Sequence, residues 1–281
     1  MCKRIVQLMI VLLAWCTFAA AQGRGALRPD PRAFDKHNLS GFWKGNQYGY
    51  NAKTVPPMTP EGKKKFESYK PSYGRQLNSQ AAKDHPEEDI GRRRAVPPAI
   101  GNDPVGGCNP LGLMRILLYD PSPMEIVQTP DRMLQMFEWT WDHREVWSDG
   151  RPAAKAEEYL PRFNGYSVGR WQGDTFVVDT NGLDDRQWVD HFGYPISDQA
   201  KLQERWTRTA YNILELRMTL TDPGTYTQPW ESDPVTFQLI TKENLAAGVG
   251  WGSLAEDRCV PLDEVDRYNK QVRDPAGGVK K

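Results

Sequence analysis

The sequence lacks an excess of charge of either sign, and it lacks the local residue pairs that usually bind metals. It contains 36 Lys and Arg residues against 36 Asp and Glu residues, so there is no basic field and no acidic tail for a polyanion partner. We therefore expect no nucleic-acid binding. No H-x-H, H-E-x-x-H or C-x-x-C pattern occurs, and we expect neither a metal nor a cofactor. A site formed in space by His143, His191 and a carboxylate is the alternative.

Long hydrophobic runs are also missing, with one exception at the start of the chain. Residues 5–18 are mainly apolar, they follow Lys3 and Arg4, and the small residues 19–21 come next. This arrangement predicts a signal peptide, residues 1–21, that is cleaved before Gln22. The apolar run is too short to span a bilayer comfortably, so we expect a secreted or periplasmic protein with no membrane span after cleavage.

Cysteine is scarce: Cys2 and Cys16 leave with the signal peptide, and only Cys108 and Cys259 remain. An even pair in an oxidising compartment predicts a disulfide. The loop that it closes is long, and the chain-entropy treatment gives a stabilisation of about 4–5 kcal/mol. Two buried free thiols are the alternative.

The rest of the chain is rich in β-branched and aromatic residues. Short apolar segments alternate with turn signals every eight to twelve residues, which is typical of a sandwich or barrel. Tight hairpins are expected at residues 172–173 and 211–212. No βαβ pattern occurs, so all connections are expected to be antiparallel. We predict an all-β, antiparallel up-and-down barrel of about 8–10 strands, with the strands at 39–48, 113–119, 124–129, 132–141, 144–147, 166–171, 174–180, 203–209, 213–220 and 235–240.

The mature chain is expected to form one domain with irregular ends. Residues 22–38 should be poorly ordered, residues 39–261 form the barrel, and residues 262–281 form a short helix and a disordered tail. Within the barrel domain, residues 51–107 form a long loop or lid. One helix is expected there, from Pro60 to Tyr69, with Thr59 as its N-cap.

Alternation within two segments predicts which faces are covered. In residues 213–220, four apolar side chains fall on one face and polar ones on the other, which indicates a half-buried strand. In residues 132–141, Phe137, Trp139 and Trp141 share one face, and Leu134, Met136 and Glu138 share the other. A strand that is apolar on both faces is expected to be covered on both.

Several segments together resemble a large, mostly uncharacterised family of exported bacterial proteins. They are LSGFW, CNPLG, MEIVQTPDRMLQMFEW, WSDGRP, GYSVGRWQGDTFVVDT, LQERW and LTDPGTYTQPW, spread over most of residues 39–260. The opening G-x-W and the meander are similar to calycin, lipocalin-like barrels, which is an analogy of fold only. Relatives often read Pro-His-Ser where this chain has Pro195-Ile196-Ser197. If that histidine carries chemistry in relatives, this chain lacks it.

Three carboxylates in apolar surroundings are candidate acid–base groups. Asp179, Glu204 and Glu138 would have a raised pKa if they were buried without a partner. His191 or Tyr166 could then donate the proton. For any one of these carboxylates, a structural ion pair with Arg132, Arg144, Arg170 or Arg205 is the favoured interpretation, whereas one functional carboxylate in the group remains the alternative. The string Gly165-Tyr166-Ser167-Val168-Gly169 spells G-x-S-x-G, but it lies in a strand pattern rather than at a strand-to-helix elbow.

The aromatic residues favour a binding function. A barrel of this size can hold one small, partly apolar ligand in its lumen. A cofactor-free acid–base enzyme (lyase, isomerase or hydrolase) acting on a small molecule is the alternative, and a purely structural envelope role is a third. The predicted catalytic residues are Asp179, Glu204, His191 and Tyr166, and the residues expected to contact a ligand are Phe137, Glu138, Trp139, Trp141, Tyr166, Arg205 and Trp206.

Overall fold

A computed structural model describes residues 27–45, 55–71, 102–119, 122–155, 158, 160–190, 192–241, 254–255, 258–261, 264, 267–273 and 275. The predicted signal peptide and most of the predicted lid lie outside the described residues.

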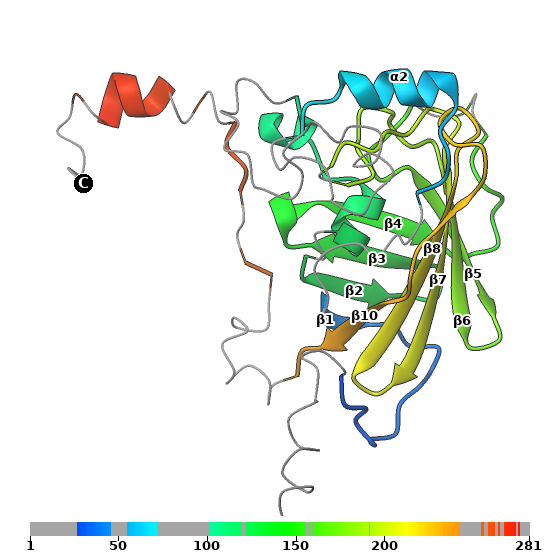
Figure 1. The fold of residues 1–281 in the computed structure, drawn as a ribbon. Helices are drawn as coiled ribbons and strands as arrows, with labels where there is room; N and C mark the ends of the chain where they lie inside the picture. Colours follow the sequence, from blue (N-terminus) through cyan, green and yellow to red (C-terminus); the bar gives the residue numbers. More distant parts are fainter. Residues whose placement is uncertain are drawn as a thin grey trace, which may run out of the picture.

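Nine strands close into a mixed barrel, which confirms the predicted all-β barrel (Figure 1). The order around the barrel is β10-β1-β2-β3-β4-β5-β6-β7-β8, and pairing of β10 with β8 closes it. A two-residue strand, β9, extends the sheet beside β8. The strands are β1 (Gly41–Gly45), β2 (Met124–Gln128), β3 (Arg132–Phe137), β4 (His143–Trp147), β5 (Tyr166–Gln172), β6 (Thr175–Asn181), β7 (Lys201–Ala210), β8 (Ile213–Thr221), β9 (Trp230–Glu231) and β10 (Val235–Leu239).

The long hairpins of the barrel follow the sequence pattern closely. The turn between β5 and β6 is at Gly173 and Asp174, one residue later than predicted, because Gln172 still pairs with Thr175. The turn between β7 and β8 is at Tyr211 and Asn212, as predicted. In β8 the predicted apolar face is buried, since Leu214, Leu216, Met218 and Leu220 are at most 2% exposed. Glycine at 173 has a φ of 58°, a left-handed conformation that glycine adopts without a steric cost.

Directly paired residues of neighbouring strands share a face, and following the register around the barrel identifies the interior. Trp206 pairs with Phe176 and Leu216, and Trp43 pairs with Met124 and Leu239. The interior is filled by large side chains at 0% exposure: Trp43, Phe137, Trp206, Leu214, Leu216, Leu220 and Phe237.

One strand pair departs from the prediction of antiparallel connections. β4 and β5 are parallel, with Val146 opposite Ser167 and Trp147 opposite Val168. The turn signal at residues 148–150 does not lead into a hairpin. The chain instead continues through residues 151–165 before β5 begins, and a parallel pair requires such a long crossover.

Residues 113–119 were predicted as a strand, and this prediction is wrong. Leu113 and Met114 are helical and continue into η2 (Arg115–Tyr119), a π-helical turn. Every residue of 113–119 is buried. A continuous apolar run of this length fits a buried strand and a buried helix equally well, so periodicity could not distinguish them.

The predicted strand at 132–141 is also too long. β3 ends at Phe137, and Trp139–Trp141 form η3, a 3-10 turn with φ of 54° at Thr140 and 56° at Trp141. The register pairs Met136 with His143, so the chain must turn between them. Trp139 and Trp141 therefore do not share a strand face with Phe137, and Trp141 is 54% exposed.

The predicted helix is present as α2 (Pro60–Ser68), which lies across one end of the barrel (Figure 1). The predicted N-cap is confirmed, because Thr59 Oγ1 accepts a hydrogen bond from Gly62 N at 3.0 Å. Phe66 points inward from α2 and stacks on Tyr194, with ring centroids 5.1 Å apart.

The predicted disulfide is confirmed. Cys108 follows η1 (Pro104–Gly107) and is bonded to Cys259, with 5.6 Å between the Cα atoms. Near Cys259, the carbonyl of Ala255 accepts a hydrogen bond from Trp141 Nε1 at 2.9 Å. Helical structure at the C-terminal end of the chain includes η5 (Asn269–Arg273).

The end of the barrel opposite α2 is covered by residues 27–40, here called the N-terminal strap (Figure 1). Residues 22–38 were predicted to be poorly ordered, but the strap is held by specific contacts. Asn212 bonds Asp30 N at 2.8 Å and the Arg28 carbonyl at 3.0 Å, and Lys36 forms an ion pair with Asp174 at 2.6 Å. The strap therefore joins the turns of two hairpins.

Candidate functional site

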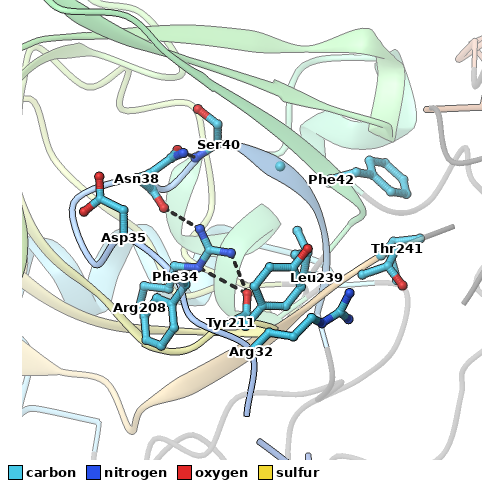
Figure 2. A pocket seen from close by; sticks show the side chains of 12 residues that line it. Arg32, Phe34, Asp35, Asn38, Ser40, Phe42, Arg208, Tyr211, Leu239 and Thr241 are labelled. Atoms are coloured by element: carbon cyan, nitrogen blue, oxygen red, sulfur yellow. Dashed lines mark hydrogen bonds between the residues drawn. The ribbon is translucent and has the colours of Figure 1, made fainter. Parts of the chain in front are cut away.

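A cavity of about 620 Å³ lies where the N-terminal strap meets the β7–β8 hairpin. We call it the end pocket, and Figure 2 shows its lining. Aromatic and aliphatic side chains form much of the wall, and two arginines contribute the positive charge. The lining residues are Arg32, Phe34, Asp35, Asn38, Ser40, Gly41, Phe42, Arg208, Tyr211, Leu239, Ile240 and Thr241.

Arg208 is the most buried charged group of the end pocket, with 6% exposure. It lies on the inward face of β7, in line with Trp206. Its Nη1 donates to the Asn38 carbonyl at 2.6 Å, and its Nε and Nη2 donate to the Tyr211 carbonyl at 3.2 and 2.5 Å. Figure 2 shows these bonds linking the strap to the hairpin turn.

The guanidinium of Arg208 is also surrounded by rings. It lies 5.5 Å from the centroids of Phe34 and Tyr211 and 5.4 Å from that of Trp43. Burial lowers the pKa of Arg208 from its usual value, but an arginine keeps its proton in proteins. The inner wall of the pocket is thus formed by the positively charged guanidinium of Arg208 and the aromatic rings around it.

Arg32 is the second cation, and it lies at the solvent side of the pocket, with its side chain 48% exposed. It forms an ion pair with Asp30 at 2.6 Å, and this hydrogen-bonded pair lowers the pKa of Asp30. Its guanidinium lies 4.1 Å from the centroid of the Tyr211 ring. Tyr211 therefore lies between the exposed and the buried arginine.

A second cavity, of about 490 Å³, lies on the outer face of β6, β7 and β8, and we call it the outer groove. Asp179 is bonded there to Arg170 and, at 2.8 Å, to Gln203 Nε2. Asn181 Oδ1 is buried without a hydrogen-bond partner among the described residues. Polar side chains dominate the lining, which consists of Ala153, Asp179, Thr180, Asn181, Lys201, Leu202, Gln203, Thr219 and Thr221.

The barrel interior holds Glu204, which is fully buried and bonded on both carboxylate oxygens. Arg144 Nη1 and Nη2 donate to these oxygens at 2.7 and 2.6 Å, and Trp206 Nε1 donates at 2.9 Å. Gln135 Oε1 accepts from Arg144 Nε at 2.7 Å. Both carboxylate oxygens of Glu204 therefore already accept hydrogen bonds from other side chains of the core.

The structure does not gather the predicted site residues into one place. Glu204 and Trp206 are in contact in the interior, where Phe137 is also buried, whereas Asp179 faces the outer groove. His191 lies outside the described residues. The contacts that these residues would make with a ligand or substrate stay a prediction.

The other predicted residues are dispersed as well. Glu138 accepts a hydrogen bond from Ala255 N at 3.0 Å, next to Trp139 and Trp141 in the β3–β4 connection. Tyr166 donates to the Leu160 carbonyl at 3.1 Å. Arg205 is on the outer face of β7, 3.4 Å from Gln172 Oε1.

Sequence reasoning missed the end pocket, although one signal for it was present. The inward alternation that selected Glu204 and Trp206 continues to Arg208, two residues further along β7. The strap residues Arg32 and Phe34 carried no signal, because they belong to a Pro-containing stretch without periodicity.

In the described part of the chain, no three or more His, Cys, Asp and Glu side chains form a cluster that could hold a metal ion. None of the helices in this part of the chain is long and apolar enough to cross a membrane.

Comparison with other proteins gave no match for this chain, neither to a protein-family model nor to a curated protein.

Proposed function

We propose that this protein binds a small, partly apolar molecule in the end pocket. The observation that supports this most directly is the pocket itself: a concavity of about 620 Å³ in which five aromatic or aliphatic side chains lie beside six polar or charged ones. Its volume falls within the range of roughly 300–1,000 Å³ that is usual for small-molecule sites, and its mixed lining suits a ligand with an apolar body and a polar head. Because strap residues and barrel residues both line the pocket, a ligand there would contact both.

The sequence favoured a ligand in the lumen, but the packing favours the end pocket. Trp43, Phe137, Trp206 and Phe237 fill the interior at 0% exposure, and the Arg144–Glu204 network occupies the space between β4 and β7. Close-packed interiors leave few voids larger than a water molecule. A ligand in the lumen would have to displace these side chains.

Native mass spectrometry tests the proposal, with two matched variants. The protein purified without denaturation is expected to carry a small molecule that is lost under denaturing conditions. Thr241→Trp fills the end pocket and should abolish this adduct, whereas Thr219→Trp fills the outer groove and should leave it. A mass equal to that of the bare chain, or an adduct lost only in Thr219→Trp, would overturn the proposal.

The enzyme alternative retains one supporting observation, which is that Asp179 lines the outer groove. Its bonds to Arg170 and Gln203 hold the carboxylate in a fixed position, as a base requires. Glu204 offers no such role, because it is fully buried and bonded to Arg144. An activity found by substrate screening should disappear in Asp179→Asn and survive in Glu145→Gln, which changes an exposed carboxylate away from the groove; an activity that survives in Asp179→Asn would exclude this groove.

We also propose that the protein is exported, as a member of the exported bacterial family that it resembles. The disulfide between Cys108 and Cys259 supports this, because such bonds persist in oxidising compartments. N-terminal sequencing of the mature protein should begin at Gln22. An intact N-terminus with both thiols free in cells would contradict export.

A further inference from the structure

The described part of the chain contains three buried arginines, and they differ in one respect. Arg115 lies 3.0 Å from Asp103 Oδ1, and Arg144 lies 2.6 Å from Glu204 Oε2. Arg208, at 6% exposure, has only the backbone carbonyls of Asn38 and Tyr211 as hydrogen-bond partners, and no ion pair joins it to a carboxylate of the described residues. Of these three buried arginines, Arg208 is therefore the one that forms no ion pair with a described carboxylate.

A buried charge without a counter-charge is costly, since neither water nor an opposite charge stabilises it. The three hydrogen bonds of Arg208 use three of the five N–H groups that a guanidinium offers. One N–H remains on each of the two terminal nitrogens. These are the donors that an arginine presents to a carboxylate.

The surroundings of Arg208 fit a ligand with an apolar body. Phe34 and Tyr211 flank its guanidinium, and Phe42 and Leu239 add apolar surface to the same cavity. Flat aromatic walls favour a flat ligand, which can stack on the rings.

Asp35, which also lines the pocket, offsets the charge of Arg208 only in part. Its negative charge raises the pKa of the guanidinium and so opposes the lowering by burial, but Asp35 is exposed. Arg32 is a cation like Arg208, and it is paired with Asp30. Solvent and salt screen an exposed charge far more than a buried one. An anion in the pocket would thus be attracted by Arg208 more strongly than it is repelled by Asp35, and Arg32 at the rim would assist its approach.

We infer, building on the proposed function, that the ligand of the end pocket is a small aromatic or apolar carboxylate whose anionic head is bound by Arg208. The bound carboxylate supplies the paired counter-charge that Arg208 does not receive from the described residues, while the apolar body lies against the rings. Arg208 also ties the strap to the hairpin, so binding of the anion stabilises the covered end of the barrel.

Three probes with one body and different heads test the inference by ¹⁹F NMR titration: 4-fluorobenzoate, 4-fluorobenzyl alcohol and 4-fluorobenzylamine. Benzoate is expected to bind about tenfold or more tightly than the alcohol, because hydrogen bonds to charged groups are worth more than neutral ones. The amine is expected to bind most weakly. Equal binding of benzoate and alcohol overturns the inference but keeps the proposed function, whereas binding of none of the three overturns both.

A site-specific readout uses the unmodified protein labelled with ¹⁵N-arginine. The Nε–H signal of Arg208, identified by its loss in Arg208→Lys, should shift on addition of 4-fluorobenzoate. Arg32→Gln changes the exposed arginine and should weaken benzoate binding severalfold without removing the preference over the alcohol. Arg217→Gln, on the outer face of β8, is the matched control and should bind as the parent does. A benzoate preference without any shift of the Arg208 signal would place the anion elsewhere.

Discussion

Arg144 and Glu204 face each other across the barrel interior, and the guanidinium donates one hydrogen bond to each carboxylate oxygen. The distances are 2.7 and 2.6 Å, and the side chains are 2% and 0% exposed. The pair connects β4 with β7, which are separated around the barrel by β5 and β6. It is therefore a contact across the core rather than between neighbouring strands.

Removing one charge of this pair is expected to be strongly destabilising. Glu204→Gln leaves the buried Arg144 uncompensated and should lower the free energy of unfolding by about 3–5 kcal/mol. Urea denaturation followed by tryptophan fluorescence measures this. The double variant Arg144→Met/Glu204→Leu should be much less destabilised than Glu204→Gln alone; if both variants unfold at the same urea concentration, the charge pair is not the cause.

Gly62 lies in α2 at the point where the helix meets the turn after β8. A Cβ at this position would collide with the carbonyl oxygen of Thr225. Helix propensity alone predicts that Gly62→Ala stabilises the helix by about 1 kcal/mol, but the collision with rigid backbone should reverse the sign. Thermal denaturation should show a lower Tm for Gly62→Ala and no loss for the exposed Lys64→Ala. A raised Tm for Gly62→Ala would mean that α2 can move away from the barrel.

The disulfide between Cys108 and Cys259 spans a sequence separation of 151 residues. In the chain-entropy treatment, a loop of this length contributes about 4–5 kcal/mol. The double variant Cys108→Ser/Cys259→Ser should be less stable by up to this amount in urea. Reducing agent should destabilise the parent protein and leave the double variant unchanged; equal effects on both would point to another cause.

The buried Asp142 is expected to make the free energy of unfolding depend on pH. Burial raises the pKa of its carboxyl above the usual 3.8. The folded state then binds the proton more tightly than the unfolded state, so the contribution of Asp142 is most favourable at low pH and is lost as pH rises through the raised pKa. The stability of the parent relative to Asp142→Asn should therefore fall as pH is raised from about 3 to 7.

Asp149 serves as the opposite case. Its hydrogen bond with Arg151 lowers the pKa of its carboxyl, so its contribution is present above the usual pKa and is lost as pH falls. The stability of the parent relative to Asp149→Asn should thus rise as pH is raised from about 3 to 7. The change should be smaller than for Asp142, because Asp149 is exposed to solvent. Slopes of the same sign for both variants would contradict the assigned causes.

The parts of the fold that the sequence predicted well are those in which local pattern and tertiary environment agree. The strict alternation of residues 213–220 became the half-buried β8, and Thr59 capped α2 as its side chain allows. The two predicted hairpin turns and the disulfide are also present. The strand, the helix cap and the turns depend on interactions between residues close in sequence. The disulfide was predictable because only two cysteines remain after the expected signal peptide.

The parts that the sequence did not predict depend on non-local contacts. Residues 113–119 are apolar throughout and became helical, and β4 and β5 became parallel although a turn signal separates them. The end pocket could not be foreseen, because it exists only when the strap lies across the β7–β8 hairpin. Arg208 could have been assigned to the interior face, but that it has no carboxylate partner among the described residues is visible only in the structure.

The most direct test of ligand binding in the end pocket is amide chemical-shift mapping of the ¹⁵N-labelled protein. The spectra are recorded with 4-fluorobenzoate and with 4-fluorobenzyl alcohol, so that the result does not depend on the head group. We predict saturable shifts for at least one probe at Asn38, Tyr211 and Thr241, around the end pocket, and none at Asp179 or Thr219 in the outer groove. Shifts confined to the outer groove or to the barrel interior, or no saturable shifts at all, would contradict the proposed site.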